Sequence, residues 1–143
     1  MHTKSPDLQR FREAHQNSYQ TALAEIKGGR KMSHWMWYIF PQISGLGRSS
    51  TSQYYAIHNM QEAIDFMNDP ILESNLIEIS ETLLLLDSNN AREIFGHPDH
   101  MKLKSSMTLF SVACPECPAF HEVLKKFFDG KQDKRTLRIL GFD

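Results

Sequence analysis

The segment from Gly28 to Ser50 carries residue types that could bind an anion and move a proton. Its sequence, GGRKMSHWMWYIFPQISGLGRSS, holds both tryptophans of the chain, a histidine, and an arginine followed by two serines. A guanidinium group binds phosphate or carboxylate with two parallel hydrogen bonds, and serine hydroxyls add donors. The glycines before Arg48 would let the backbone come close to a ligand. Arg48, Ser49 and Ser50 are therefore candidate ligand-binding residues.

An imidazole and two aromatic rings complete this first group of candidates. His34 is flanked by basic residues and could donate a hydrogen bond or transfer a proton, which makes it the candidate catalytic group. Trp35 or Tyr55 could stack on a planar ring of the ligand. In the alternative interpretation the aromatic residues complete a hydrophobic core and Arg48 pairs with a carboxylate, because large aromatic side chains dominate protein interiors.

A second group lies in the segment IFGHPDHMKLKSSMTLF, residues 94–110. On a helix, Asp99, Lys102 and Ser106 fall at i, i+3 and i+7 and share one polar stripe. An acid, a base and a hydroxyl on one stripe could bind and polarise a ligand, with Asp99 as the catalytic carboxylate. They could equally form a surface ion pair worth ~0.3–0.5 kcal/mol. The other face is predicted to be packed, and it carries Leu103, Met107, Phe110 and Cys114.

The chain's only two cysteines raise the question of a metal or a disulfide. Cys114, Cys117 and His121 have the spacing C-x2-C-x3-H, but a structural zinc site needs four ligands, and nothing in the sequence brings a fourth close. We therefore expect no metal and no cofactor. A disulfide-stapled secreted domain usually carries four or more cysteines, so the pair is expected to be reduced unless it forms a local redox couple.

Charge is distributed unevenly along the chain. The net charge of −1 argues against bulk attraction to nucleic acid or to an anionic membrane. From Ile26 to Gln61 there is no acidic residue and the charge is +4, whereas from Glu62 to Asp99 nine acids face one base and the charge is −8. This segregation indicates either a positive region that faces an anion, with the acidic half on another face, or a fold that neutralises itself internally.

The size and the termini predict a cytoplasmic protein with a single domain over residues 1–143. A length of 143 residues suits one domain. No apolar run approaches the ~20 residues needed to span a bilayer, and the amino terminus, MHTKSPDLQRF, lacks the apolar core of a secretory signal. Residues 1–5 are expected to be a loose tail.

Helix signals recur along the chain and predict an all-α bundle of about six to eight helices with no significant sheet. Period-two alternation is not sustained anywhere. Apolar residues at helical spacing, such as Leu72, Leu76, Ile79 and Leu83, follow residues that favour helix starts. The expected helix starts are at Ser5-Pro6, Ser33, Asn59, Asp69-Pro70, Asn90, His97-Pro98-Asp99, Pro118 and about Asp133.

Four pieces in this order resemble one known family: the segment from Gly28 to Ser50, YYAI, EAIDFMNDPIL, and residues 94–110. It is a small bacterial family of unknown function with an HWMW-x-IFPQ motif, sometimes labelled calpastatin in genome listings. The resemblance runs from about Phe11 to Leu140 and implies a compact, mainly α-helical domain, but no particular activity, substrate or cofactor. Calpain inhibitors are long, disordered and repetitive, and this aromatic-rich chain is not, so the label is set aside.

The preferred hypothesis from the sequence is a pocket between the two motif segments for a small anionic metabolite, such as a nucleotide or a phosphosugar. Hydrolysis or group transfer there would need no redox cofactor. The anion would be held by Arg48, Lys102, Ser49, Ser50 and Ser106. The alternative is a non-catalytic protein-interaction module in which the aromatic residues are core. Nucleic-acid binding is disfavoured because of the acidic region.

Overall fold

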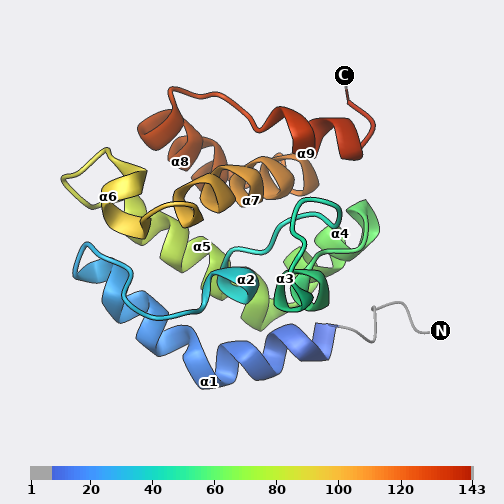
Figure 1. Cartoon of the computed structure of the whole chain (residues 1–143), viewed down its shortest axis with the longest axis horizontal. Helices are drawn as coiled ribbons and strands as arrows, with labels where there is room; N and C mark the ends of the chain where they lie inside the picture. The colour runs from blue at the N-terminus through green and yellow to red at the C-terminus, as the bar shows by residue number, and fades with distance from the viewer. Residues whose placement is uncertain (1–7, 143) are drawn as a thin grey trace.

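The computed structural model describes residues 8–142, and these form nine α-helices and no strand (Figure 1). The all-α architecture expected from the sequence is confirmed. The helices are α1 (Leu8–Lys27), α2 (Met36–Ile39), α3 (Ser50–Tyr55), α4 (Met60–Asn68), α5 (Pro70–Leu84), α6 (Ala91–Phe95), α7 (Asp99–Ala113), α8 (Pro118–Phe128) and α9 (Lys134–Ile139). Their number exceeds the six to eight expected, partly because the short α3 has no strong signal in the sequence.

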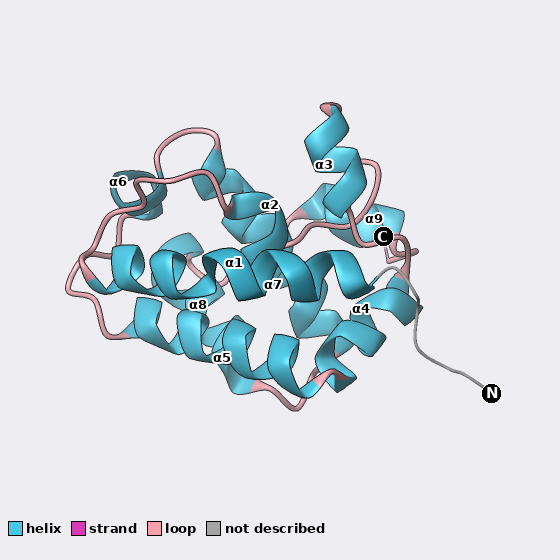
Figure 2. Cartoon of the chain, turned by 90° about the horizontal axis from the view of Figure 1, so that it is seen from below, coloured by secondary structure: helices cyan, strands magenta, loops and turns pink. Residues whose placement is uncertain are grey.

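Helices α5 and α7 form the centre of the bundle. Helix α5 packs against α1, α4 and α8, and α7 packs against α4, α6, α8 and α9. The segment between α1 and α4, which carries α2 and α3, covers the side of the body opposite α5 (Figure 2). Leu103, Met107 and Phe110 of α7 are fully buried, as their spacing predicted.

Most helices begin at a residue whose side chain accepts a hydrogen bond from the first turn. Asn59, Asp69, Asn90 and Asp133 all cap in this way. Ser33 does not cap, contrary to expectation: α2 begins only at Met36, and the Ser33 hydroxyl donates to Glu25 instead (2.5 Å). The expected Ser5-Pro6 cap and the loose tail at residues 1–5 lie outside the described residues.

Cys114 and Cys117 are joined by a disulfide. The expectation that both cysteines are reduced is therefore wrong, and the alternative of a local redox couple remains. Cys114 ends α7 and Cys117 precedes α8, and the turn brings their Cα atoms to 5.5 Å, within the range of about 4.4–6.8 Å that a disulfide needs. Sulfurs bonded to each other are not the thiolates that zinc requires. In residues 8–142 no group of three or more His, Cys, Asp or Glu residues could hold a metal ion.

Within the same described range, no helix combines the length and the apolar character that crossing a membrane requires.

Candidate functional site

A cavity of about 480 Å³ lies where both motif segments meet the carboxyl-terminal part of the chain. The loop after α2 contributes Gln42, Leu46 and Gly47. The start of α7 contributes the largest share of the lining, namely Pro98, His100, Met101, Lys102, Lys104 and Ser105. The last part of the chain adds Phe128, Asp133 and Arg135.

The loop that lines one wall is fixed by backbone hydrogen bonds and by close packing. The Ser44 and Ile57 amides donate to the carbonyls of Ile57 and Gln42, both at 2.8 Å, so the two ends of the loop pair as a single β-bridge. At Gly47 an added Cβ would lie 2.5 Å from Ser52 Cβ, which leaves room only for glycine. Gly47 therefore serves the packing of this wall against α3.

Three cationic side chains line the cavity against one carboxylate. Lys102 lies 3.4 Å from Asp99, but within residues 8–142 neither Lys104 nor Arg135 has an ion-pair partner. The carboxylate of Asp133 caps the start of α9, where it accepts hydrogen bonds from the Thr136 amide (3.0 Å) and hydroxyl (2.5 Å). The cavity thus presents a surplus of positive charge.

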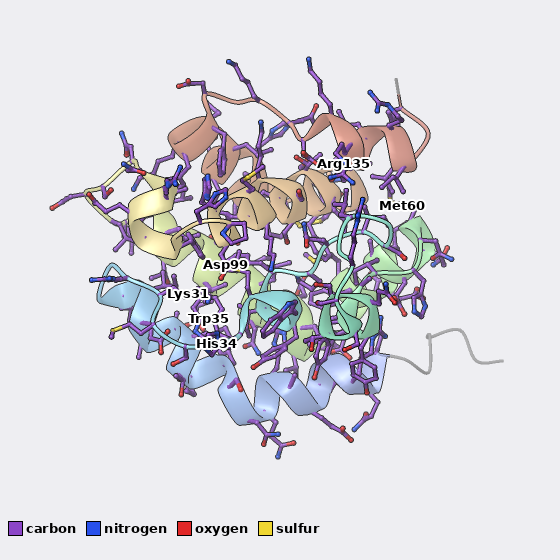
Figure 3. All side chains as sticks on the ribbon, in the orientation of Figure 1. Lys31, His34, Trp35, Met60, Asp99 and Arg135 are labelled. Carbon is purple, nitrogen blue, oxygen red and sulfur yellow. A yellow bond between two sulfur atoms is a disulfide. The ribbon has the colours of Figure 1, made fainter. Side chains whose placement is uncertain are left out.

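Asp99 forms ion pairs with two lysines. Lys31 Nζ lies 2.8 Å from one carboxylate oxygen, with only 8% of its side chain exposed, and Lys102 Nζ lies near the other. The pair with Lys31 ties the start of α7 to the connection between α1 and α2; Figure 3 labels Lys31 and Asp99. His34 is exposed, and in the described part of the chain no hydrogen bond or ion pair joins its imidazole to Asp99. The structure therefore does not pair the two expected catalytic residues.

Trp35 belongs to the core, which favours the core interpretation of its ring. Only 1% of the residue is exposed, and its indole N–H donates to Glu25 (2.8 Å). The same carboxylate accepts bonds from the Met32 amide and from the Ser33 amide and hydroxyl. Burial alone would raise the pKa of Glu25, but these donors outweigh it and lower the pKa to about 2. Glu25 thus orders the connection that leads into α2.

The exposed hydroxyl and arginine candidates lie outside the cavity lining. Arg48 and Ser50 are exposed, and Ser49 caps α3 by accepting a hydrogen bond from the Ser52 amide (3.1 Å). Tyr55 packs against Tyr38, with 5.0 Å between ring centroids. Of the nine candidate residues, the structure brings only Lys102 to the cavity wall, beside residues that sequence reasoning missed.

Ser106 is fully buried, so the expected polar stripe on α7 ends at Lys102. From Leu103 onward the neighbouring helices enclose α7 and bury its small polar residues as well. Among the described residues the Ser106 hydroxyl has no hydrogen-bond partner. It is Ser105 that lines the cavity, where its hydroxyl donates to the Met101 carbonyl (3.3 Å).

We expect Ser106→Ala to leave the free energy of unfolding unchanged or to raise it by up to about 1 kcal/mol, because an unpaired buried hydroxyl costs more than the small void left behind. Urea denaturation measures this. Thr108→Val is the matched control on the same helix, since the Thr108 hydroxyl donates to Lys104 and accepts from the Asp133 amide. The control should lose about 1–3 kcal/mol. A comparable loss in Ser106→Ala would contradict the assignment of an unpaired hydroxyl.

Sequence reasoning missed Gln42, His100, Lys104 and Arg135 as residues of this cavity. Gln42 is part of the IFPQ motif, which was a usable signal. Lys104 lies two residues from the candidate Lys102, and Arg135 stands in a basic stretch near the carboxyl terminus. Burial lowers the pKa of His100 and outweighs the hydrogen bond of its ring to the Gly96 carbonyl, which acts to raise it.

The fold and the cavity define an α-helical domain with a pocket lined by cationic side chains from α7 and α9. The chain belongs to a family described as proteins of unknown function (DUF1810), whose model matches residues 5–140. A crystal structure of the conserved hypothetical protein Rv1873 from Mycobacterium tuberculosis is similar to this chain, with 37% identity and a TM-score of 0.92 over 96% of this chain and 98% of that one. No curated protein matches the chain.

Proposed function

We propose that the cavity binds a small anionic metabolite of the nucleotide or phosphosugar type. The observation that carries the proposal is the convergence of Lys102, Lys104 and Arg135 on one cavity, with no ion-pair partner for the last two among the described residues. Lysine and arginine side chains bind phosphate groups through charge-assisted hydrogen bonds. The uncharged part of the ligand would contact the apolar lining, which consists of Leu46, Pro98, Met101 and Phe128.

A hydrolase or transferase reaction at this site would use His100 as the proton acceptor. His100 lines the cavity, whereas His34 and Asp99 do not. The lowered pKa of His100 favours the neutral imidazole, the form that can take up a proton. The cytoplasmic location, the bacterial source and the absence of nucleic-acid and membrane partners stay predictions from the sequence.

A thermal-shift screen against nucleotides, sugar phosphates and dicarboxylates tests the binding proposal. A ligand at 100 times its dissociation constant adds ~2.7 kcal/mol, so the melting temperature should rise by about 5–10 °C. We expect Lys104→Ala/Arg135→Ala to abolish the shift and Arg48→Ala, an exposed arginine outside the lining, to retain it. If instead Arg48→Ala abolished the shift and Lys104→Ala/Arg135→Ala retained it, the binding site would lie at Arg48, as first proposed from the sequence.

The alternative is a non-catalytic protein-interaction module. It is favoured by exposed apolar side chains at Met101, which lines the cavity, and at Ile139 and Phe142 near the carboxyl terminus. Tryptophan fluorescence separates the two functions, because Lys102 Nζ lies 5.6 Å from the centre of the Trp37 ring. A metabolite held by Lys102 should change this emission, and Trp37→Phe should remove the response. A screen with no hit and unchanged emission would favour the interaction module.

A further inference from the structure

A second cavity of about 620 Å³ adjoins the first and extends its positive charge. The two cavities share Lys104, Asp133 and Arg135. The second is lined in addition by the connection from α8 to α9 and by α9 itself, through Lys131, Gln132, Lys134 and Leu137. Figure 3 labels Arg135, one of the shared residues, on α9.

The shared wall is held together by one buried threonine. The Thr108 hydroxyl donates to the Lys104 carbonyl and accepts from the Asp133 amide, both at 2.8 Å. Thr108 is fully buried, so this link between α7 and the start of α9 is not open to solvent competition. It fixes the backbone of Lys104 next to the turn that presents Arg135.

The two cavities differ in the residues outside their shared wall, and this difference points to a ligand with two parts. Much of the first lining is apolar, through Leu46, Met101 and Phe128. The second is lined by four cationic side chains, those of Lys104, Lys131, Lys134 and Arg135, none of which has an ion-pair partner within residues 8–142. Its one carboxylate, Asp133, is engaged with Thr136. Like charges gathered without counter-charges repel one another, and a chain of phosphates would relieve this repulsion.

From this arrangement we infer that the ligand is a nucleoside diphosphate or triphosphate. Its base and sugar occupy the first cavity, against Met101 and Phe128. The first phosphate lies at the wall shared by Lys104 and Arg135, and the later phosphates extend over Lys131 and Lys134. This inference rests on the proposed function. It specifies in addition that the ligand carries two or three phosphates and which residues bind them.

Isothermal titration of the full chain with the mono-, di- and triphosphates of adenosine, guanosine, cytidine and uridine, and with inorganic tripolyphosphate, tests the inference. For at least one nucleoside we expect the triphosphate to bind about tenfold or more tightly than the monophosphate, since each added phosphate gains charge-assisted bonds. Lys131→Ala/Lys134→Ala should remove this gain and leave the monophosphate affinity within about twofold. Lys104→Ala/Arg135→Ala should weaken all three.

The matched control is Lys27→Ala/Lys125→Ala, which removes two exposed lysines outside both cavities. If this control lost as much affinity for the triphosphate as Lys131→Ala/Lys134→Ala, the effect would come from net charge alone, and the inference would be overturned. Equal affinity of the unmodified chain for mono- and triphosphates would also overturn it while the proposed function stands. If tripolyphosphate bound as tightly as every nucleotide, the base and sugar would add nothing to the affinity, and the inferred place for them in the first cavity would be wrong. If none of the phosphates binds in titration and no anion of the thermal-shift screen binds either, the proposed function itself fails.

Discussion

Replacing Arg10 by Met is expected to lower the free energy of unfolding by about 3–5 kcal/mol, because the change removes the cation of a buried ion pair. Arg10 and Glu62 are 3.0 Å apart, with only 6% and 3% of their side chains exposed. The guanidinium also donates to the carbonyls of Tyr54 and Ala56, both at 2.7 Å. It thereby anchors α3 and the end of the loop whose other end lines the cavity.

The measurement is urea or thermal denaturation of the two single variants and the double variant. The melting temperature of Arg10→Met should fall by about 10–15 °C. Adding Glu62→Gln should recover part of the loss, because the neutral side chain no longer needs the cation, whereas the carbonyls of Tyr54 and Ala56 stay without their donor. Strictly additive effects would contradict a coupled buried pair. Arg12→Ala is the comparison for a more exposed pair, since Arg12 contacts Asp69 with 30% of its side chain exposed.

Acidification from pH 6.5 to pH 4 is expected to cost about 3 kcal/mol of stability through His15 alone. His15 is 3% exposed. Its Nε2–H donates to the Tyr38 carbonyl (2.8 Å), and its Nδ1 accepts from the Asn75 side chain (3.1 Å). Burial lowers the pKa of His15 to about 4, in spite of the bond to Tyr38 and the charge of Asp69, which act to raise it.

The direction of the pH effect follows from which state binds the proton. The unfolded chain takes up a proton at His15 near pH 6.5, whereas the folded chain does so only near pH 4. The stability that neutral His15 contributes is therefore complete above pH 6.5 and is lost progressively as the pH falls toward 4. The carboxylates of Glu25 and Asp69, whose pKa values are lowered, lose their contributions only below their ordinary values of 4.5 and 3.8.

His15→Gln is the variant that isolates this effect, because a glutamine can donate to Tyr38 and accept from Asn75 but does not titrate. Denaturation at pH 7.0, 6.0 and 5.0 should show a loss of stability in the original chain that is much smaller in the variant. His100 titrates in both proteins, so the difference between them reports His15. Parallel curves would show that His15 keeps an ordinary pKa.

The two expected effects matter for the site because both residues attach the stretch between α1 and α4 to α1. His15 bonds to the chain at Tyr38, just before Gln42, and Arg10 bonds to it at Tyr54 and Ala56, just before Ile57. The stretch between these anchors contains the wall of the cavity. Loss of either anchor is therefore expected to weaken ligand binding as well as stability.

The internal ion pairs also explain why charge along the chain did not locate the site. Lys31 of the acid-free stretch pairs with Asp99 of the acidic stretch, and Arg10 and Arg12 pair with Glu62 and Asp69. Three acids of the acidic stretch are thus paired inside the fold, one of them with a cation of the acid-free stretch, so internal neutralisation accounts for part of the segregated charge. The cations that line the cavity come from later in the chain, at Lys102 and beyond.

Most of the helices, the all-α class and the family could be predicted from the order of residues alone. Helix starts such as Asn59, Asp69 and Asp133 could be predicted because a cap bonds to amides two or three residues away. The packed face of α7 could be predicted because Leu103, Met107 and Phe110 repeat at helical spacing. These features depend on neighbours along the chain, which the order of residues already contains.

Which polar residues meet at the cavity depends on how the helices pack against one another. Successive residues on a helix point about 100° apart, so Ser105 rather than Ser106 lines it once α7 is packed among its neighbours. Lys104 and Arg135 come together through the Thr108 link to the start of α9, which no spacing in the sequence announces. Trp35 packs against Phe40 and Phe95, and its buried indole N–H is satisfied by Glu25, which lies ten residues earlier on α1. Such contacts depend on how each helix is rotated against distant ones, and local periodicity carries no information about that rotation.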